Sequence, residues 1–249
     1  MCESRTDSAV KSYFYDLHIH SCLSPCGDDD MTVSNIAGMA FIKGLGLVAL
    51  TDHNTSKNTP AFFETCKAYG IVPVAGMELT TAEEIHLLCL FPTLDSALRF
   101  DEAVDGFRMK IKNKPEIFGE QTVLDSEDNV IGNDPYLLPI ATALSLDEAS
   151  ALADSFGGVS MPAHIDRPSN GILAILGTMP DTPTFHYVEL RDRAKREECG
   201  AESRHVLVNS DAHMLEDINE PENSISLDVP DDADDDTVRA ALIKKLRGG

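Results

Sequence analysis

The sequence is poor in basic residues, and this scarcity is its clearest compositional feature. The 249 residues include 20 Lys and Arg against 42 Asp and Glu, which gives a formal net charge of −22. Such a balance disfavours the binding of a long nucleic acid through a basic surface. Most of the acidity is that of a solvated surface. We therefore expect a partner other than a long nucleic acid.

The chain also lacks the segments that address a protein to membranes or to the secretory route. No stretch approaches the roughly 18 continuous apolar residues of a membrane span, and residues 1–15 contain no apolar leader core. We expect a cytoplasmic protein with no membrane partner. The six cysteines are scattered, so most should be reduced packing residues.

A pair of histidines stands out near the start of the chain. His18 and His20 follow an apolar and aromatic run that predicts a strand, and residues i and i+2 of a strand point to the same side. Two imidazoles presented together can hold a divalent cation. An isolated pair of this kind can equally be structural, so further ligands at other strand ends must decide.

Apolar runs and helical patterns alternate along most of the chain. Residues 33–42 and 60–69 predict helices, and 47–50, 71–74, 85–90, 159–162, 187–190 and 206–208 predict strands. This alternation is typical of βα units around a parallel sheet. It is interrupted at about 94–156, where we expect a helix over 94–112, a hairpin over 121–131 and a helix over 146–156 that begins with a capping box at Ser145 and Glu148.

Five predicted strand ends carry His, Asp or Glu. In βα barrels such ends converge on one face, so residues far apart in sequence can form one site. Five ends of this kind, each following an apolar run, strongly favour a metal centre over isolated structural histidines. The candidates are His18 with His20, His53, Glu78 with His86, His164, and Asp211 with His213.

In their order, these motifs resemble those of the PHP (polymerase and histidinol phosphatase) family. They are Asp-Leu-His-Ile-His-Ser at 16–21, Thr-Asp-His-Asn at 51–54, Gly-Met-Glu at 76–78, Pro-Ala-His at 162–164 and Ser-Asp-Ala-His at 210–213. The resemblance implies an α/β fold, a distorted seven-stranded (β/α) barrel. One such domain would span residues 1–249, with an insertion at about 94–156. It also implies two to three divalent ions (zinc, iron or manganese) and phosphoester hydrolysis.

The family pattern also assigns ligands to a trinuclear site. It places His18, His20, Glu78 and Asp211 on one ion, with Glu78 bridging to a second ion held by His86 and His164. A third ion would take His53, His213 and a residue of the loop after the first strand. Family members have a histidine six residues after the pair, where this chain has Cys26. Cys26 could ligate a soft or borderline metal, Asp28 could replace it, or the third site could be weak.

Two further residues are candidate catalytic groups. Arg167 follows the His164 motif and can clamp a phosphate, against the alternative of a surface ion pair. Asp52 precedes His53 and can orient a ligand imidazole, or it can simply cap a turn.

The resulting hypothesis is a phosphoesterase that acts on a small phosphorylated metabolite or nucleotide by attack of a metal-bound hydroxide on phosphorus. Two alternatives stay open. One is an amidohydrolase-type enzyme acting on C–N or C–O bonds, and the other is a non-catalytic module that binds metal or phosphate.

Overall fold

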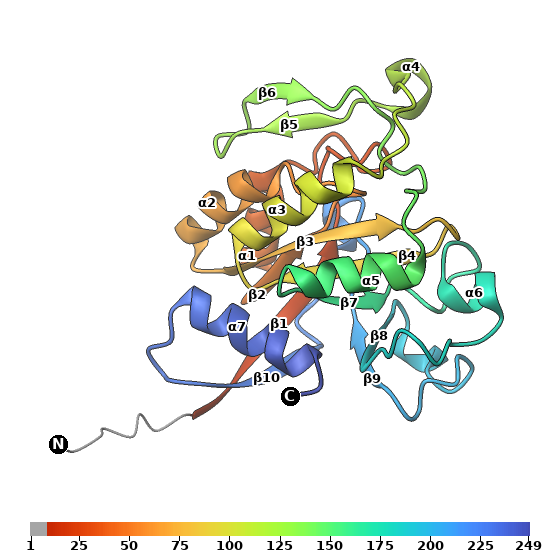
Figure 1. Ribbon diagram of the computed structural model, residues 1–249. Coiled ribbons are helices and arrows are strands. Elements are labelled where there is room, and N and C mark those ends of the chain that lie inside the picture. The colour runs from red at the N-terminus through yellow and green to blue at the C-terminus, as the bar shows by residue number, and fades with distance from the viewer. Residues whose placement is uncertain (1–8) are drawn as a thin grey trace.

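The computed structural model describes residues 9–249, whose strands form one six-stranded sheet and two pairs (Figure 1). The strands are β1 (Ala9–Ile19), β2 (Leu47–Leu50), β3 (Val72–Thr80), β4 (His86–Phe91), β5 (Thr122–Leu124), β6 (Val130–Asn133), β7 (Val159–Pro162), β8 (Tyr187–Leu190), β9 (His205–Val208) and β10 (Ser224–Val229). The α-helices are α1 (Val33–Ile42), α2 (Thr59–Tyr69), α3 (Leu94–Asp105), α4 (Pro115–Phe118), α5 (Leu146–Ser155), α6 (Ile172–Leu176) and α7 (Asp235–Leu246). Over this range, every helix is too short or too polar to cross a bilayer.

The large sheet has the strand order β10-β1-β2-β3-β4-β7. Its β1, β2 and β3 are parallel, whereas β4 runs antiparallel to both β3 and β7. Only residues 81–85 separate β3 from β4, and a parallel crossover needs about a dozen residues, so β4 returns as a hairpin. The pattern of uniform βα units did not predict this return. It places His86, the first residue of β4, opposite Thr80 and close to Glu78.

The expected seven-stranded barrel is not confirmed, because the sheet is a curled half-barrel of six strands. β8 and β9 pair in parallel with each other alone. Isolated contacts join this pair to the sheet. Ile165 N, just after β7, donates to Glu189 O of β8 (3.0 Å), and Ala212, just after β9, forms a bridge with Ile19 of β1. Pro162, which ends β7, has no N–H, and His164 has a φ of 29°. The chain therefore leaves the extended conformation before a longer ladder can form.

Both faces of the parallel strands are buried, which explains their continuous apolar sequences. Within β2, Val48 and Leu50 face one core while Leu47 and Ala49 face the other. The first core is covered by α1, α2, α3 and α5, and the second by α7. Figure 1 shows α7 on the opposite side of the sheet from α1 and α2. The strand ends that carry the candidate ligands are thus fixed by packing on both sides.

Residues 94–156, where the βα alternation is interrupted, contain the helices and the hairpin that the sequence predicts, but the first helix is shorter than expected. α3 ends at Asp105 before Gly106, seven residues earlier than expected. β5 and β6 form the predicted hairpin. α5 begins with the predicted capping box, in which Ser145 N donates to Glu148 Oε2 (2.9 Å) and Glu148 N donates to Ser145 Oγ (3.4 Å).

One buried side chain, Asn58, connects this region to the loop after β1. Its Nδ2 donates to Ser21 Oγ (3.0 Å) and to Thr122 O (3.1 Å), while its Oδ1 accepts from Leu124 N (2.9 Å). Thr122 N also donates to Cys22 O (3.2 Å). The first strand of the hairpin and the loop after the histidine pair therefore belong to one hydrogen-bonded unit.

Candidate metal centre

The histidine pair lies at the end of β1 with both rings turned to the same side. His18 Nε2 and His20 Nε2 are 3.1 Å apart, and both side chains are fully buried. Asp211 Oδ1 lies 3.5 Å from the first of these nitrogens and 3.4 Å from the second. Two imidazoles and one carboxylate thus converge on a single buried point, a donor set suited to a divalent cation.

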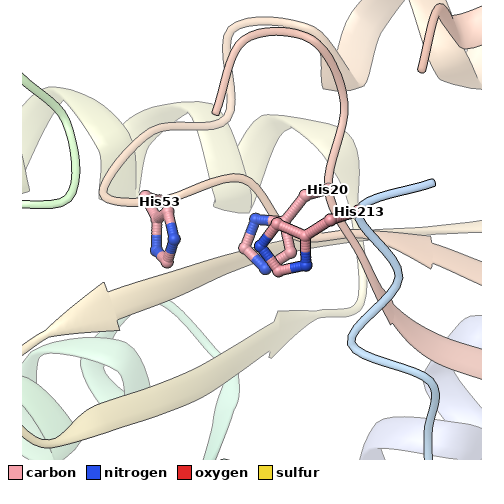
Figure 2. Close-up of side chains that lie close together, drawn as sticks. All are labelled: His20, His53 and His213. Atoms are coloured by element: carbon pink, nitrogen blue, oxygen red, sulfur yellow. The ribbon is translucent and has the colours of Figure 1, made fainter. Parts of the chain in front are cut away.

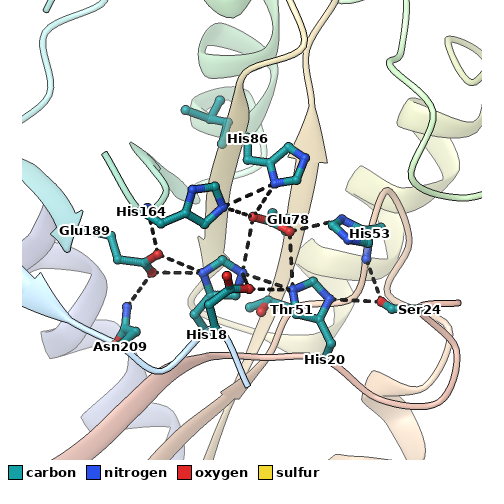
Figure 3. A network of polar contacts seen from close by, with 12 residues as sticks. His18, His20, Ser24, Thr51, His53, Glu78, His86, His164, Glu189 and Asn209 are labelled. Atoms are coloured by element: carbon teal, nitrogen blue, oxygen red, sulfur yellow. Dashed lines mark hydrogen bonds and ion pairs between the residues drawn. The ribbon is translucent and has the colours of Figure 1, made fainter. Parts of the chain in front are cut away.

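Glu78 is the centre of the cluster (Figure 3). A carboxylate oxygen of Glu78 lies within 3.3 Å of an imidazole nitrogen of each of five histidines: His18, His20, His53, His86 and His164. Its Oε1 faces His86 Nδ1 at 2.8 Å and His164 Nε2 at 2.9 Å, while Oε2 faces His53 Nδ1 at 3.0 Å. One carboxylate oriented in this way can bridge two cations.

The donor atoms form three overlapping groups, each gathered within 4.8 Å. The groups are His18–His20–Glu78–Asp211, His53–Glu78–His86 and His20–His53–His213. The first has the composition that the family pattern predicts for one ion. Figure 2 shows the third, in which the ring of His20 lies 4.5 Å from that of His53 and 4.4 Å from that of His213.

Cys26 lies at the exposed rim of the site and is not part of the third group. It occupies a turn in which Gly27 N donates to Ser24 O (2.8 Å), and Asp28 N donates to His213 O (2.9 Å). A Cβ on Gly27 would meet Ser21 O at 2.7 Å, so this position requires glycine. The Cys26 side chain is among the neighbours that raise the pKa of His53.

The reasoning from sequence missed the carboxylate that orients the first histidine. Glu189, fully buried in β8, lies 2.9 Å from His18 Nδ1 and accepts hydrogen bonds from His164 N (2.9 Å) and Asn209 Nδ2 (2.7 Å). A carboxylate on Nδ1 fixes the tautomer and leaves Nε2 free for a ligand. The available signal was the presence of an acid inside the otherwise apolar run Tyr187–Leu190.

Asp52 lies beneath the cluster and supports the loop after β1. Its carboxylate accepts hydrogen bonds from Ser21 N (2.8 Å), Ser21 Oγ (2.6 Å) and Ser24 Oγ (2.7 Å). Ser24 Oγ is in turn 3.0 Å from His20 Nδ1 and accepts from His53 N (3.1 Å). Asp52 is therefore connected to His20 and to the backbone of His53 through Ser24.

Backbone strain accompanies the candidate ligands. His164 and Asp211 have φ values of 29° and 53°, in the left-handed region that residues other than glycine seldom occupy. Asn54, next to His53, has a φ of 51°. Such strain persists where the surrounding structure enforces it, and it is concentrated at functional sites.

The carboxylates raise the proton affinity of three histidines. Burial alone would lower the pKa of an imidazole, but Glu189 and other acids outweigh it and raise the pKa of His18 well above its usual value. The pKa of His20 and that of His53 are raised against burial to about 9 by neighbouring acids, which include Glu78 for both. A cation that binds here must displace these protons.

Other groups of the cluster shift in the opposite sense. Burial and the nearby charge of His20 lower the pKa of His213 to about 3, and burial lowers the pKa of His86. Burial would raise the pKa of Glu78, yet the surrounding imidazoles hold it well below its usual value. The site therefore presents ionised carboxylates beside some imidazoles that are already neutral, the protonation states that metal ligation requires.

Unpaired polar atoms test whether this donor set fits metal ions. Among the described residues, four buried cluster atoms lack a hydrogen-bond partner: Glu78 Oε2, Asp211 Oδ1, His53 Nδ1 and His164 Nδ1. The first and third are only 3.0 Å apart but are not aligned for a hydrogen bond. Unpaired buried polar groups cost free energy. Their concentration among nitrogen and carboxylate donors fits divalent cations.

Arg167 lies at the edge of the cluster rather than inside it. Its Nη1 donates to Asp211 Oδ2 (2.7 Å), and its side chain is 32% exposed. Arg167 thus forms an ion pair, the alternative considered from the sequence. It also faces solvent beside the candidate ligands, so its position is compatible with contact to a phosphate.

Residues 16–136 match the PHP domain family. This segment is a PHP domain. The resemblance drawn from the motifs is thereby confirmed for the three motifs it contains, at 16–21, 51–54 and 76–78. The motifs at 162–164 and 210–213 lie beyond the matched residues, and the fold brings His164 and Asp211 to the PHP cluster.

Similar proteins extend this relationship. The chain is 32% identical over 102 residues to an uncharacterised protein of Methanocaldococcus jannaschii, covering 37% of this chain and 60% of that protein. The fold of this chain is similar to that of a lesion-specific endonuclease, endonuclease Q of Pyrococcus furiosus, with a TM-score of 0.62 and 21% sequence identity. The match covers 95% of this chain and 56% of the endonuclease chain. The chain thus spans less than two thirds of either protein.

Two shorter proteins match over most of their length. One is a putative metal-dependent phosphoesterase from Bifidobacterium adolescentis, with a TM-score of 0.55 and 18% identity over 92% of this chain and 95% of that chain. The other is an amidohydrolase from Chromobacterium violaceum, with a TM-score of 0.54 and 15% identity over 88% and 92%. At these identities the likeness shows a shared fold and leaves the substrate open.

The expectation of a small phosphorylated partner to the exclusion of a long nucleic acid is wrong. A second structure of endonuclease Q holds a 27-mer duplex substrate with an abasic lesion at the active site, and it matches 95% of this chain at 20% identity with a TM-score of 0.57. A net charge of −22 does not exclude a nucleic-acid partner, because bound cations and nearby side chains set the electrostatic potential at the site itself.

Proposed function

We propose that this protein is a metal-dependent phosphoesterase that cleaves phosphodiester bonds of a nucleic acid. The observation that supports it most strongly is the Glu78-centred cluster, in which one carboxylate is shared by two of three adjacent donor groups. Neighbouring cations bridged by a carboxylate suit phosphoryl chemistry, in which both the attacking and the leaving oxygen need stabilisation. The unpaired buried donor atoms of the same cluster add to this support.

The residues divide into those that hold cations and those that set their geometry. One ion would be held by His18, His20, Glu78 and Asp211, a second by Glu78, His86 and His164, and a third by His53 and His213 with Cys26 at its rim. When bound, such ions supply a Lewis acid and activate water for attack on phosphorus. Glu189 holds the ring of His18 in place, and Asp52 does the same for His20 through Ser24.

Arg167 would contact the substrate directly. Its bond to Asp211 uses Nη1, and a guanidinium has five N–H donors in a planar fork. The remaining donors can bind phosphoryl oxygens and offset the charge that develops on them during the reaction.

The fold similarity to endonuclease Q favours a nucleic-acid substrate, because it extends over 95% of this chain. The amidohydrolase-type alternative would be expected to carry a separate metal-bridging lysine or carboxylate and a lone late Asp. Here Asp211 is followed two residues later by His213, and His53 belongs to a Thr-Asp-His motif at 51–53. These features support phosphoester rather than C–N or C–O chemistry.

The test is a substrate panel with metal-loaded protein. We expect cleavage of an oligonucleotide duplex or single strand, and of bis(p-nitrophenyl) phosphate, after loading with manganese, zinc or iron. His18→Gln should reduce turnover by at least ~10²-fold, since losing a ligand costs no less than losing a group that orients one. His205→Gln is the matched control, because His205 begins β9, is exposed and stacks on Tyr187.

Three outcomes would overturn the proposal. Equal turnover by the wild type and His18→Gln would show that the metal cluster takes no part in the reaction. Hydrolysis of amides or lactones with no cleavage of any phosphoester would favour the amidohydrolase-type alternative. Stoichiometric binding of oligonucleotide without cleavage under any metal would indicate a binding module.

A further inference from the structure

A cavity opens beside the candidate metal centre, among the loops that follow β7, β8 and β9. Its volume is about 510 Å³, and it is open to solvent on one side. Three basic side chains line it, Arg167, Arg191 and Lys195. In a chain with less than one basic residue for every two acidic ones, this grouping is unusual.

Two residues of the cavity wall also contact the cluster. Arg167 donates to Asp211 Oδ2 (2.7 Å), and the other oxygen of that carboxylate faces the histidine pair. Asn209 Nδ2 donates to Glu189 Oε2 (2.7 Å), and Glu189 holds His18. The cavity is therefore next to the proposed reaction centre, separated from it by single side chains.

The basic residues of the loop after β8, of which Arg191 and Lys195 line the cavity, differ in whether their side chains form hydrogen bonds. Arg193 donates to Asn223 Oδ1 (2.8 Å), and Arg196 bonds backbone carbonyls. By contrast, no hydrogen bond or ion pair from residues 9–249 engages the side chains of Arg191 and Lys195, and both residues are exposed. These two charges are available to a ligand.

Three acids also line the cavity, but two of them serve the local backbone. Asp166 accepts hydrogen bonds from the backbone N–H groups of Arg191 and Asp192, at 3.1 Å each. Asp192 Oδ1 accepts from Ala194 N (2.8 Å). The third acid, Asp217, is exposed on the opposite loop. Asp166 and Asp192 are thus engaged in hydrogen bonds to backbone N–H groups, whereas the side chains of Arg191 and Lys195 are not engaged.

We infer that this cavity binds a second phosphate of the substrate, adjacent to the phosphate at the metal cluster. The inference rests on the proposed phosphoesterase function. Arg191 supplies a planar fork that matches a phosphate, and Lys195 supplies a point charge. A nucleic-acid strand carries consecutive phosphates and would occupy both places at once, whereas a monophosphate ester would leave the cavity unused.

Binding of a fluorescein-labelled thymidine oligonucleotide, followed by anisotropy over a range of salt concentrations, tests the subsite without turnover. Each lost phosphate contact to a single strand lowers the slope of log affinity against log salt by about 0.7, so Arg191→Gln/Lys195→Gln should lower it by about 1.4. The control Lys67→Gln/Lys244→Gln removes two exposed charges elsewhere and should keep the wild-type slope. Equal slopes for the wild type and the cavity variant would overturn the inference.

A substrate comparison links the subsite to cleavage. In a thymidine trinucleotide, the linkage next to the cleaved one is made a neutral methylphosphonate. Wild-type kcat/KM should fall roughly tenfold for the loss of one charge-assisted contact, while the cavity variant should cleave both substrates equally slowly. A nucleoside bisphosphate that competes as strongly as the oligonucleotide would support the second phosphate but assign it to a small molecule.

The two proposals can fail separately. If the wild type cleaves no phosphoester, the proposed function fails, and anisotropy still reports on the cavity. If the wild type cleaves the charged and the neutral trinucleotide equally well, the function stands and the second-phosphate subsite is refuted.

Discussion

Replacing Glu78 by glutamine removes one negative charge and keeps the shape of the side chain. The substituted carboxylate lies 3.3 Å or less from nitrogens of five histidines and belongs to two of the three donor groups. The remaining group, His20–His53–His213, does not include it. Glu78→Gln should therefore weaken two metal sites and spare the third.

The size of the effect follows from the burial of the carboxylate. Removing one partner of a buried charge pair costs about 3–5 kcal/mol, and about 1.4 kcal/mol corresponds to a tenfold change in affinity. The two sites that share Glu78 should each lose roughly 10²–10⁴-fold in metal affinity. In metal-free protein, the pKa of His53 should also fall from about 9 toward its usual value, because Glu78 is its strongest favourable partner.

Elemental analysis after dialysis, isothermal titration calorimetry and histidine NMR titration measure these changes. Glu84→Gln is the matched control, since Glu84 is an exposed residue of the turn between β3 and β4. We expect the control to retain the wild-type metal content. If Glu78→Gln retained all of its metal with affinities within about threefold of the wild type, the assignment of Glu78 as the shared ligand would be refuted.

Three other substitutions address single features of the site and fold. Glu189→Gln should lower metal affinity by about 10–100-fold in calorimetry because it weakens the hold on His18 Nδ1, and an unchanged affinity would remove this orienting role. Cys26→Ser should lower zinc affinity at the third site by about tenfold or more while sparing manganese, since a thiolate favours the softer ion; equal zinc titrations would exclude the thiol as a ligand. Burial raises the pKa of Asp101 to about 6, so the folded state keeps its proton to higher pH than the unfolded state, and stability falls as pH rises from about 4 to 6. Asp101→Asn should accordingly raise the free energy of unfolding above pH 6 by up to about 3 kcal/mol and change it little at pH 4. Urea unfolding at the two pH values measures this difference, and equal effects at both would contradict the shifted pKa.

The candidate ligands could be predicted from the sequence because each follows an apolar run. Strand ends of one sheet converge, so the position of His53 or Asp211 after such a run already implied a common site. The same reasoning placed α5 and its cap correctly, since Ser145 and Glu148 form a local pattern. Local chemistry and strand periodicity thus account for most of what could be predicted.

What escaped prediction depends on pairing and on contacts between distant residues. The short link at 81–85 was visible, but the antiparallel return of β4 emerges only when strand and loop lengths are considered together. Glu189 belongs to a predicted strand, but only the fold shows that its carboxylate lies against His18. The incomplete barrel follows from Pro162 and the left-handed backbone of His164, whose joint effect no apolar pattern records.

Asn58 has a consequence for the way this fold can be altered. Its single amide ties the β5–β6 hairpin to the loop that carries Cys26. An exchange of residues 94–156 between relatives would therefore change more than an appendage, because the grafted segment must supply the backbone groups of Thr122 and Leu124. A chimera whose backbone does not reach Asn58 at these two positions would leave a buried amide without its partners, next to the loop that carries Cys26.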